Sequence, residues 1–199
     1  MSFQKNIAAG LLLVLMIPHY TTAPTKWLIL KACTVTVNGS TNINKFTCII
    51  PDYGNHDTLT CFRSNRSTAV SMTGQLIVPV AGFNCASTIM TRDLRKTLQS
   101  IAFPSLFIQF VSLQRYPALK LQEEHIAGRV IIELAGVKKQ LEVNYTISMD
   151  EMGVVSLKGT QSILFTDFNL IAPRKLGGMI RTNNQLDVVF VIHCKIINP

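Results

Sequence analysis

The residues of this chain that could do chemistry are few and widely spaced. The histidines are His19, His56, His125 and His193. No two of them have the HxH or HExxH spacing of a metal-binding pair, and the chain contains no GxSxG, P-loop or GxGxxG motif. The adjacent acids Glu123 and Glu124 fit a solvated loop. The sequence therefore predicts a protein that is not an enzyme, with no catalytic residue, no metal and no cofactor.

The cysteines point to structure rather than to catalysis. They are Cys33, Cys48, Cys61, Cys85 and Cys194. None has CxxC spacing, which argues against a zinc or thioredoxin-type site. The odd number leaves at least one free thiol or an intermolecular bridge. If residues 43–50 and 58–63 form a hairpin centred between Gly54 and Asn55, Cys48 and Cys61 lie opposite each other and can form a disulfide.

The first residues have the pattern of a signal peptide, which we assign to residues 1–23. Lys5 precedes an apolar run over 7–17 that is too short to span a bilayer and ends before Pro18. Small residues follow, but a proline at position 24 disfavours cleavage directly before it, so the cleavage point stays open. A short membrane anchor is one alternative, and lipidation at Cys33 is another. Export predicts a periplasmic or secreted protein in which disulfides form.

Composition places the rest of the chain among globular domains. Hydrophobic residues make up 48% of the 199 residues and charged residues 15%, which excludes a disordered chain. The net charge of +8 raises the question of nucleic acid. The basic residues are scattered, however, and aromatic residues do not alternate with them as in single-strand binders. We therefore expect a solvated basic surface and no nucleic-acid partner.

Alternating apolar residues predict strands over most of the chain. We expect strands at 27–37, 43–50, 58–63 and 154–165, and further strands around the short turns 135–139, 150–153 and 183–184. Three sets of residues share a face: Val130, Ile132 and Leu134; Leu141, Val143, Tyr145 and Ile147; and Val188, Phe190, Ile192, Cys194 and Ile196. The simplest result is an antiparallel meander that forms a barrel or a sandwich.

One segment, residues 88–101, has a helical rather than an alternating pattern. Met90, Leu94, Leu98 and Ile101 fall on one face of the predicted helix, with basic residues on the outer face. The dipeptide Phe-Pro at 103–104 ends it. The expected fold is therefore all-β with one short helix.

Four segments together resemble the YceI-like family, in particular its variants common in Bacteroidota-type bacteria. They are VNGSTNINKFTC (37–48), FNCASTIMTRDLRKTLQSIAFPSLFIQF (83–110), AGRVIIELAGVKKQLEVNY (127–145), and LKGTQSILFTDFNLIAPRKLGGMI (157–180) continued by VVFVIHCKI (188–196). Their order and spacing make a chance match unlikely, and the likeness covers residues 27–197. The resemblance implies an eight-stranded, antiparallel, lipocalin-like barrel with one helix at one end.

The resemblance also implies an elongated apolar cavity that holds a polyisoprenoid tail. More familiar members carry a His-Ser pair near the first strand, where this chain has GSTNIN (39–44), so contacts at that position are open. The resembling variants often carry cysteines together at the positions of Cys48 and Cys85. This favours a Cys48–Cys85 bridge, and the Cys48–Cys61 bridge remains the alternative.

We expect the following residues to line the cavity: Leu98, Phe103, Ile108, Phe110, Val130, Ile132, Leu134, Val143, Tyr145, Ile163, Phe165, Phe168, Val188, Phe190 and Ile192. Arg174 and Lys175 would lie in a rim at 173–178 and meet the head group. Asp167 would fix a corner through bonds to its own backbone.

The leading hypothesis is a periplasmic protein that holds a prenyl pyrophosphate, a quinone or another long-chain lipid for transport or storage. One alternative is an envelope stress or interaction protein with a filled barrel. Another is an enzyme that acts on an isoprenoid inside the cavity. A transient contact with a membrane surface and a dimer are both compatible with the sequence.

Overall fold

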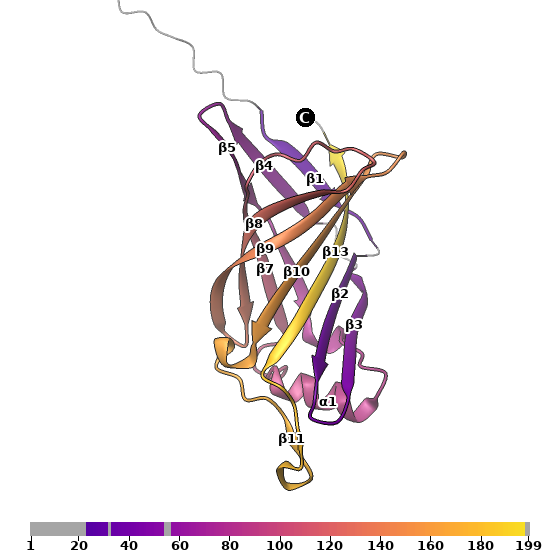
Figure 1. Cartoon of the computed structure of the whole chain (residues 1–199). Helices are drawn as coiled ribbons and strands as arrows, with labels where there is room; N and C mark the ends of the chain where they lie inside the picture. The colour runs from indigo at the N-terminus through magenta and orange to yellow at the C-terminus, as the bar shows by residue number, and fades with distance from the viewer. Residues whose placement is uncertain (1–22, 32, 54–56, 198–199) are drawn as a thin grey trace, which may run out of the picture.

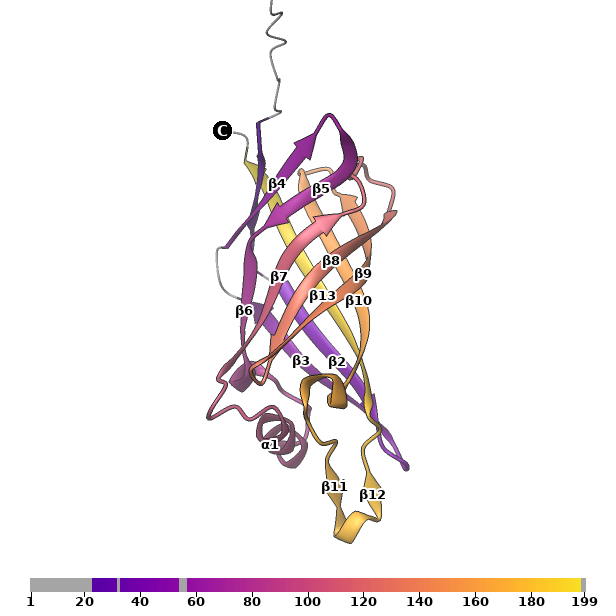
Figure 2. The ribbon, with the colours of Figure 1, turned by 90° about the vertical axis from the view of Figure 1, so that its left-hand side faces the viewer.

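The computed structural model describes residues 23–31, 33–53 and 57–197. The expectations for the signal segment up to residue 22, for His19 and for His56 fall outside these residues. The described chain forms one barrel of long, tilted strands with a single α-helix at one end (Figures 1 and 2). We call this the α1 end. The first strand starts and the last strand finishes at the opposite end (Figure 1).

The strands follow the alternation of the sequence. Their bounds are β1 (Thr25–Ile29), β2 (Cys33–Ser40), β3 (Lys45–Tyr53), β4 (Thr58–Ser64), β5 (Ser67–Thr73), β6 (Gln75–Pro79), β7 (Ser105–Leu113), β8 (Glu124–Leu134), β9 (Val137–Met149), β10 (Val154–Leu164), β11 (Arg174–Lys175), β12 (Ile180–Arg181) and β13 (Gln185–Ile197). Short 3-10 helices are η1 (Val80–Gly82), η2 (Phe165–Phe168) and η3 (Leu176–Gly178).

Antiparallel pairing closes eight of these strands into a ring. The order is β1-β4-β5-β7-β8-β9-β10-β13, and β13 pairs again with β1. The longest ladders join β8 to β9 and β10 to β13, each over eleven pairs of residues. The prediction of a closed, eight-stranded antiparallel barrel with one helix is confirmed.

Three consecutive strands of the barrel are interrupted at mid-height. β1 and β2 follow each other in the same direction, as do β3 and β4, and β5 and β6 (Figures 1 and 2). The last break falls at Gly74, whose φ of 120° suits glycine alone and where a Cβ would lie 2.6 Å from the carbonyl oxygen of Thr58. The predicted hairpin between 43–50 and 58–63 is therefore wrong. β3 pairs with β2, and β4 pairs with β1 and β5, because the chain continues along the barrel instead of turning back.

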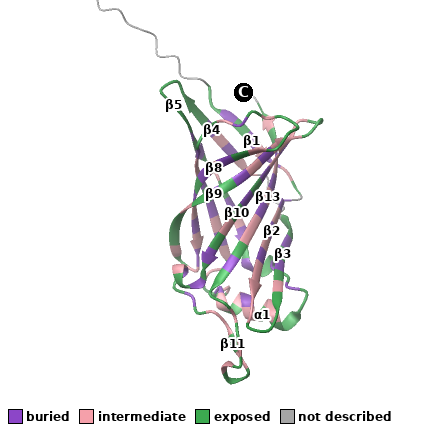
Figure 3. Ribbon diagram, viewed as in Figure 1, coloured by how far each residue is buried: buried purple, intermediate pink, exposed green. Residues whose placement is uncertain are grey.

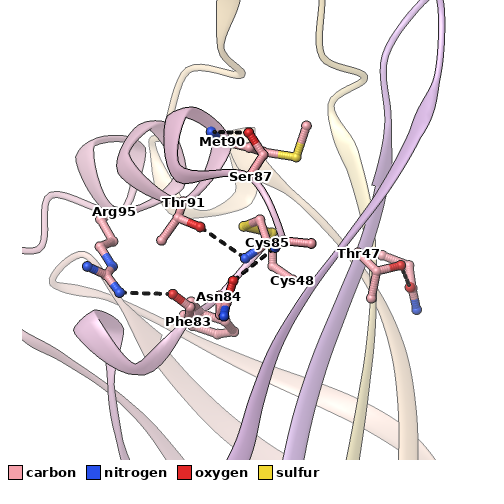
Figure 4. The surroundings of a disulfide bond; sticks show 11 residues. Thr47, Cys48, Phe83, Asn84, Cys85, Ser87, Met90, Thr91 and Arg95 are labelled. Carbon is pink, nitrogen blue, oxygen red and sulfur yellow. Dashed lines mark hydrogen bonds between the residues drawn. A yellow bond between two sulfur atoms is a disulfide. The ribbon is translucent and has the colours of Figure 1, made fainter.

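A disulfide joins the barrel wall to the helix segment at the α1 end. Cys48 of β3 is bonded to Cys85, which lies between η1 and the helix. The backbones of Ile49 and Asn84 form an isolated bridge beside it, with two N–H···O bonds of 2.8 and 3.0 Å. Figure 4 shows the backbone N–H of Cys85 donating to the hydroxyl of Thr91 at 3.0 Å. The Cys48–Cys85 pairing implied by the family resemblance is confirmed, and the Cys48–Cys61 alternative is wrong.

The helix α1 (Thr88–Thr97) lies at this end of the barrel with its apolar face turned inward. The Ser87 hydroxyl accepts the backbone N–H of Met90 at 3.4 Å and caps the helix. Leu94 and Leu98 are buried as predicted. Ile101 is fully exposed, contrary to the prediction, because the helix ends at Thr97 and the chain then turns through a positive φ at Gln99.

The interior of the barrel forms one apolar core. Buried residues recur on alternate positions of the strands (Figure 3). The largest fully buried side chains include Trp27, Phe83, Phe110, Tyr145 and Phe190. Among the described residues, no helix has both the length and the apolar character needed to cross a membrane.

We predict that replacing both Cys48 and Cys85 with Ser lowers the free energy of unfolding by about 3 kcal/mol, because the bridge closes a long loop. Urea denaturation of the double variant and of the wild type measures the difference. The wild type in a reducing agent should lose the same amount, whereas the double variant should lose nothing more. Equal stability of oxidised wild type and double variant would show that the bridge does not stabilise the fold.

Candidate functional site

The polar residues that could do chemistry remain scattered in the structure. His125 is exposed and its Nδ1 lies 3.3 Å from the Thr146 hydroxyl. Glu124 forms an ion pair with Arg115 at 2.7 Å and accepts the backbone N–H of Ala118. Across the described residues, no group of three or more histidine, cysteine and acidic side chains is placed to hold a metal ion. The described histidine and acidic side chains at 124–125 thus make local contacts on the surface.

Three cysteines are free thiols inside the barrel. Cys33, Cys61 and Cys194 are all buried. Burial raises the pKa of the Cys61 thiol to about 12, and it raises the pKa values of the other two thiols as well. The Cys33 thiol donates to the carbonyl oxygen of Leu30 at 3.1 Å. Since the thiolate is the nucleophile, these protonated groups act as small apolar side chains.

Most of the residues predicted to line a cavity are buried in the apolar core. The buried ones are Leu98, Ile108, Phe110, Val130, Ile132, Leu134, Val143, Tyr145, Ile163, Phe165, Phe168, Phe190 and Ile192. Phe103 and Val188 are half-buried. The interior also contains Trp27, Val35, Leu157 and Leu186, which the cavity prediction omitted. The alternation of β2 and β10 in the sequence could have identified Val35 and Leu157.

Three aromatic rings meet in the middle of the barrel. The Phe190 ring lies edge-to-face with Phe110 and with Tyr145, at centroid distances of 6.4 and 5.9 Å. Glycine makes room for this cluster, because a Cβ at Gly159 would lie 2.1 Å from Cζ of Phe190. On the other side, a Cβ at Gly128 would lie 2.6 Å from the Tyr145 ring. In this conformation the rings occupy the space that a guest would need.

The Tyr145 hydroxyl is the polar group of this cluster. It is buried and has no hydrogen-bond partner among the residues that the structure describes. Burial raises the pKa of Tyr145, so the hydroxyl stays protonated and can donate a hydrogen bond. A buried polar group without a partner costs free energy. A ligand with an acceptor oxygen next to the Tyr145 hydroxyl would accept its hydrogen bond and remove that cost.

Two surface hollows adjoin the helix rather than the barrel interior. The larger is a groove of about 1070 Å³ along α1, lined among others by Phe83, Ala86, Arg92, Lys96 and Ile101. The sequence did not predict this groove. The basic outer face of the helix is the sequence feature that could have indicated the groove. The position of Ile101 in its lining could not be predicted, because it depends on where the helix ends.

The second hollow, of about 450 Å³, contains the predicted rim residues. Arg174 is exposed and Lys175 is half-buried, and both line this hollow together with Ile171. Lys175 forms an ion pair with Asp93 of α1. The corner before the rim forms as expected, since Asp167 accepts the backbone N–H of Leu164 at 3.2 Å. The residues that line this hollow with Arg174 and Lys175 include neighbours in the chain of the predicted cavity residues Leu98 and Phe168, but not those two residues themselves.

Solved structures share this architecture. A polyisoprenoid-binding domain from Saccharophagus degradans, implicated in plant cell wall breakdown, matches with a TM-score of 0.58 at 10% identity, over 85% of this chain and 97% of that chain. BcnA of Burkholderia cenocepacia matches with a TM-score of 0.60 at 10% identity, over 81% of this chain and 95% of that chain. The sequence matches no family model and no curated protein. The likeness therefore shows the fold, and it is the fold that the YceI-like resemblance predicted.

We predict that Gly159→Ala destabilises the protein by about 1–3 kcal/mol, because the new methyl group collides with the Phe190 ring in a packed interior. The matched control is Gly82→Ala, whose Cβ would make an ordinary contact with Ile50 at 3.5 Å. Urea denaturation compares the two variants with the wild type. An unchanged stability for Gly159→Ala would show that the interior has free space beside Phe190.

Proposed function

We propose that this protein is an exported, non-enzymatic lipid-binding protein that holds a polyisoprenoid-type amphiphile in its barrel for transport or storage. The proposal includes a signal peptide in residues 1–23, a binding domain over 27–197 and a periplasmic or secreted location. The observation that carries it is the apolar interior of a closed barrel whose fold resembles that of a polyisoprenoid-binding domain. The disulfide fits an oxidising compartment.

The physical chemistry of a prenyl tail suits such an interior. Removing apolar surface from water contributes about 0.8 kcal/mol per buried methylene-sized group. Ordering the tail and imperfect packing offset a large part of this sum. The remaining affinity needs few polar contacts, which agrees with an interior whose described side chains are almost entirely apolar. Selectivity would then come from the length of the tunnel and from groups at its mouth.

Binding inside the barrel requires the aromatic cluster to move. Phe190 and Tyr145 fill the centre, so a tail that passes them must rotate their rings to other rotamers. The unpaired hydroxyl of Tyr145 favours a guest that carries an acceptor oxygen near this level. A quinone ring carries such an oxygen.

A second candidate function follows from the same cluster. Because Phe110, Tyr145 and Phe190 pack against one another and against glycines, the barrel is also compatible with a filled core. The protein would then act as an envelope interaction protein without a ligand. Retention of a hydrophobic mass by the purified protein in native mass spectrometry favours the first function, and its absence favours the second.

We predict that Ile132→Trp reduces retention of a polyprenyl lipid about tenfold, because the larger ring narrows the interior at a buried position of β8. Ile131→Trp is the matched control, since its side chain lies on the other face of the same strand and is only half-buried. Gel filtration with a labelled polyprenyl pyrophosphate or quinone measures retention, and circular dichroism confirms that each variant folds. Equal losses in the two variants would place the lipid outside the barrel.

We also predict that neutralising Arg174 and Lys175 together, as Arg174→Gln and Lys175→Gln, weakens a polyprenyl pyrophosphate about tenfold and a quinone hardly at all. The reason is that the charge of Arg174, and that of Lys175 once it exchanges Asp93 for the ligand, would face the pyrophosphate. Competition binding with both lipids on one variant makes the comparison. The control is Lys138→Gln, since Lys138 is exposed and pairs with Glu133. A similar loss for both lipids would argue against a head-group role.

A further inference from the structure

The α1 end of the barrel exposes an unusual set of large apolar side chains. They are Ile43, Ile89, Ile101, Ile171, Leu176 and Met179, with exposed fractions between 58% and 100%. They lie on separate segments: the β2–β3 turn, α1, the turn after it, the chain after η2, and the β11–β12 hairpin. Figures 1 and 2 place α1, the β2–β3 turn and this hairpin together at one end of the molecule.

Polar contacts hold these segments to one another. The Asn42 side chain donates to the carbonyl oxygen of Met179 and accepts the backbone N–H of Arg181, each at 2.9 Å. This fixes the β2–β3 turn against the hairpin. The ion pair between Lys175 and Asp93 fixes the hairpin against α1. The exposed apolar side chains therefore belong to one preassembled surface rather than to independent loops.

Basic side chains surround these apolar ones. The exposed ones are Lys45, Arg92, Lys96, Arg174 and Arg181. Asp93, the single acid of α1, is paired with Lys175 and so does not cancel the charge of the others. The α1 end thus combines apolar projections with positive charge, which is the combination that binds an anionic lipid surface.

We propose that the α1 end docks on an anionic lipid bilayer, with the six apolar side chains inserted at the level of the head groups and the basic side chains against lipid phosphates. A bilayer fits better than a folded protein. The apolar residues stand on separate projections, which suits a deformable surface, whereas a protein partner needs one continuous and complementary patch. The groove of about 1070 Å³ along α1 would then open toward the lipids.

This inference goes beyond lipid binding in the interior and does not depend on it, because a filled barrel would dock in the same way. Docking through the α1 end would also fix the orientation of the protein relative to the bilayer. The described chain starts and finishes at the end opposite α1 (Figure 1), so these two ends of the chain would face away from the bilayer.

The test is flotation of the full chain with vesicles of phosphatidylcholine alone, or of phosphatidylcholine mixed with about one-third phosphatidylglycerol. We expect binding to the anionic vesicles, little binding to the neutral ones, and weaker binding at high salt. The double variant Ile89→Glu with Ile101→Glu, which alters two exposed residues of the α1 end that lie outside the rim at 173–178, should bind about tenfold less. The matched control is Leu121→Glu with Met152→Glu, which alters two residues that are 66% and 84% exposed but lie outside the α1 end. This control should bind as the wild type does.

Three outcomes would overturn the proposal: a wild type that does not float with anionic vesicles, equal binding of wild type and the Ile89–Ile101 variant, and an equal loss in the control. All variants keep residues 1–22, so a difference between them comes from the α1 end. Retention of a labelled polyprenyl lipid, measured separately on the Ile89–Ile101 variant, should stay unchanged. Loss of vesicle binding with unchanged retention distinguishes docking from binding in the interior.

Discussion

The whole structure depends on the pairing of β13 along both of its edges. One edge pairs with β10 over eleven residues, and the other pairs with β2 at the α1 end and with β1 at the opposite end. This closes the ring and turns alternate side chains of every strand toward a common interior. Each of the eight strands in the ring is paired along both edges, which leaves no free edge there, whereas at the α1 end β3 pairs with β2 and β6 pairs with β7. The closure also places Phe190 of β13 at the centre, where the ring contacts Tyr145 and Phe110.

Because the first strands are interrupted, the strands are connected differently at the two ends of the barrel. Away from α1, β1 and β4 complete the ring by continuous pairing. At the α1 end, the β2–β3 hairpin is joined to the helix segment by the Cys48–Cys85 bridge and the contact between Ile49 and Asn84. The covalent bond thus holds the helix against the wall at the end where the grooves and the exposed apolar side chains also lie. Lipid uptake and membrane docking would therefore take place at the same end.

Sequence reasoning predicted the regular parts of this architecture and missed features that depend on distant contacts. The faces of β8, β9 and β13 followed from alternation because each strand buries one side. The predicted hairpin that would have paired Cys48 with Cys61 was wrong, because the local sequence pattern cannot distinguish a turn between two strands from a break within one strand. The prediction that Ile101 lies on the apolar face of the helix was wrong, because the helix ends one turn earlier than its periodicity suggests. The aromatic cluster was not predicted as a unit, since Phe110, Tyr145 and Phe190 are far apart in the chain and meet only when the barrel closes.

The central claim is that the barrel interior binds a lipid when the rings of the aromatic cluster rotate to other rotamers. The most direct measurement is a crystal structure of the protein after incubation with a polyprenyl lipid. The account predicts elongated density inside the ring of strands, with the rings of Phe190 and Tyr145 rotated away from their present positions. Unmoved rings and an interior filled by the same side chains, with lipid absent or bound outside, would contradict it.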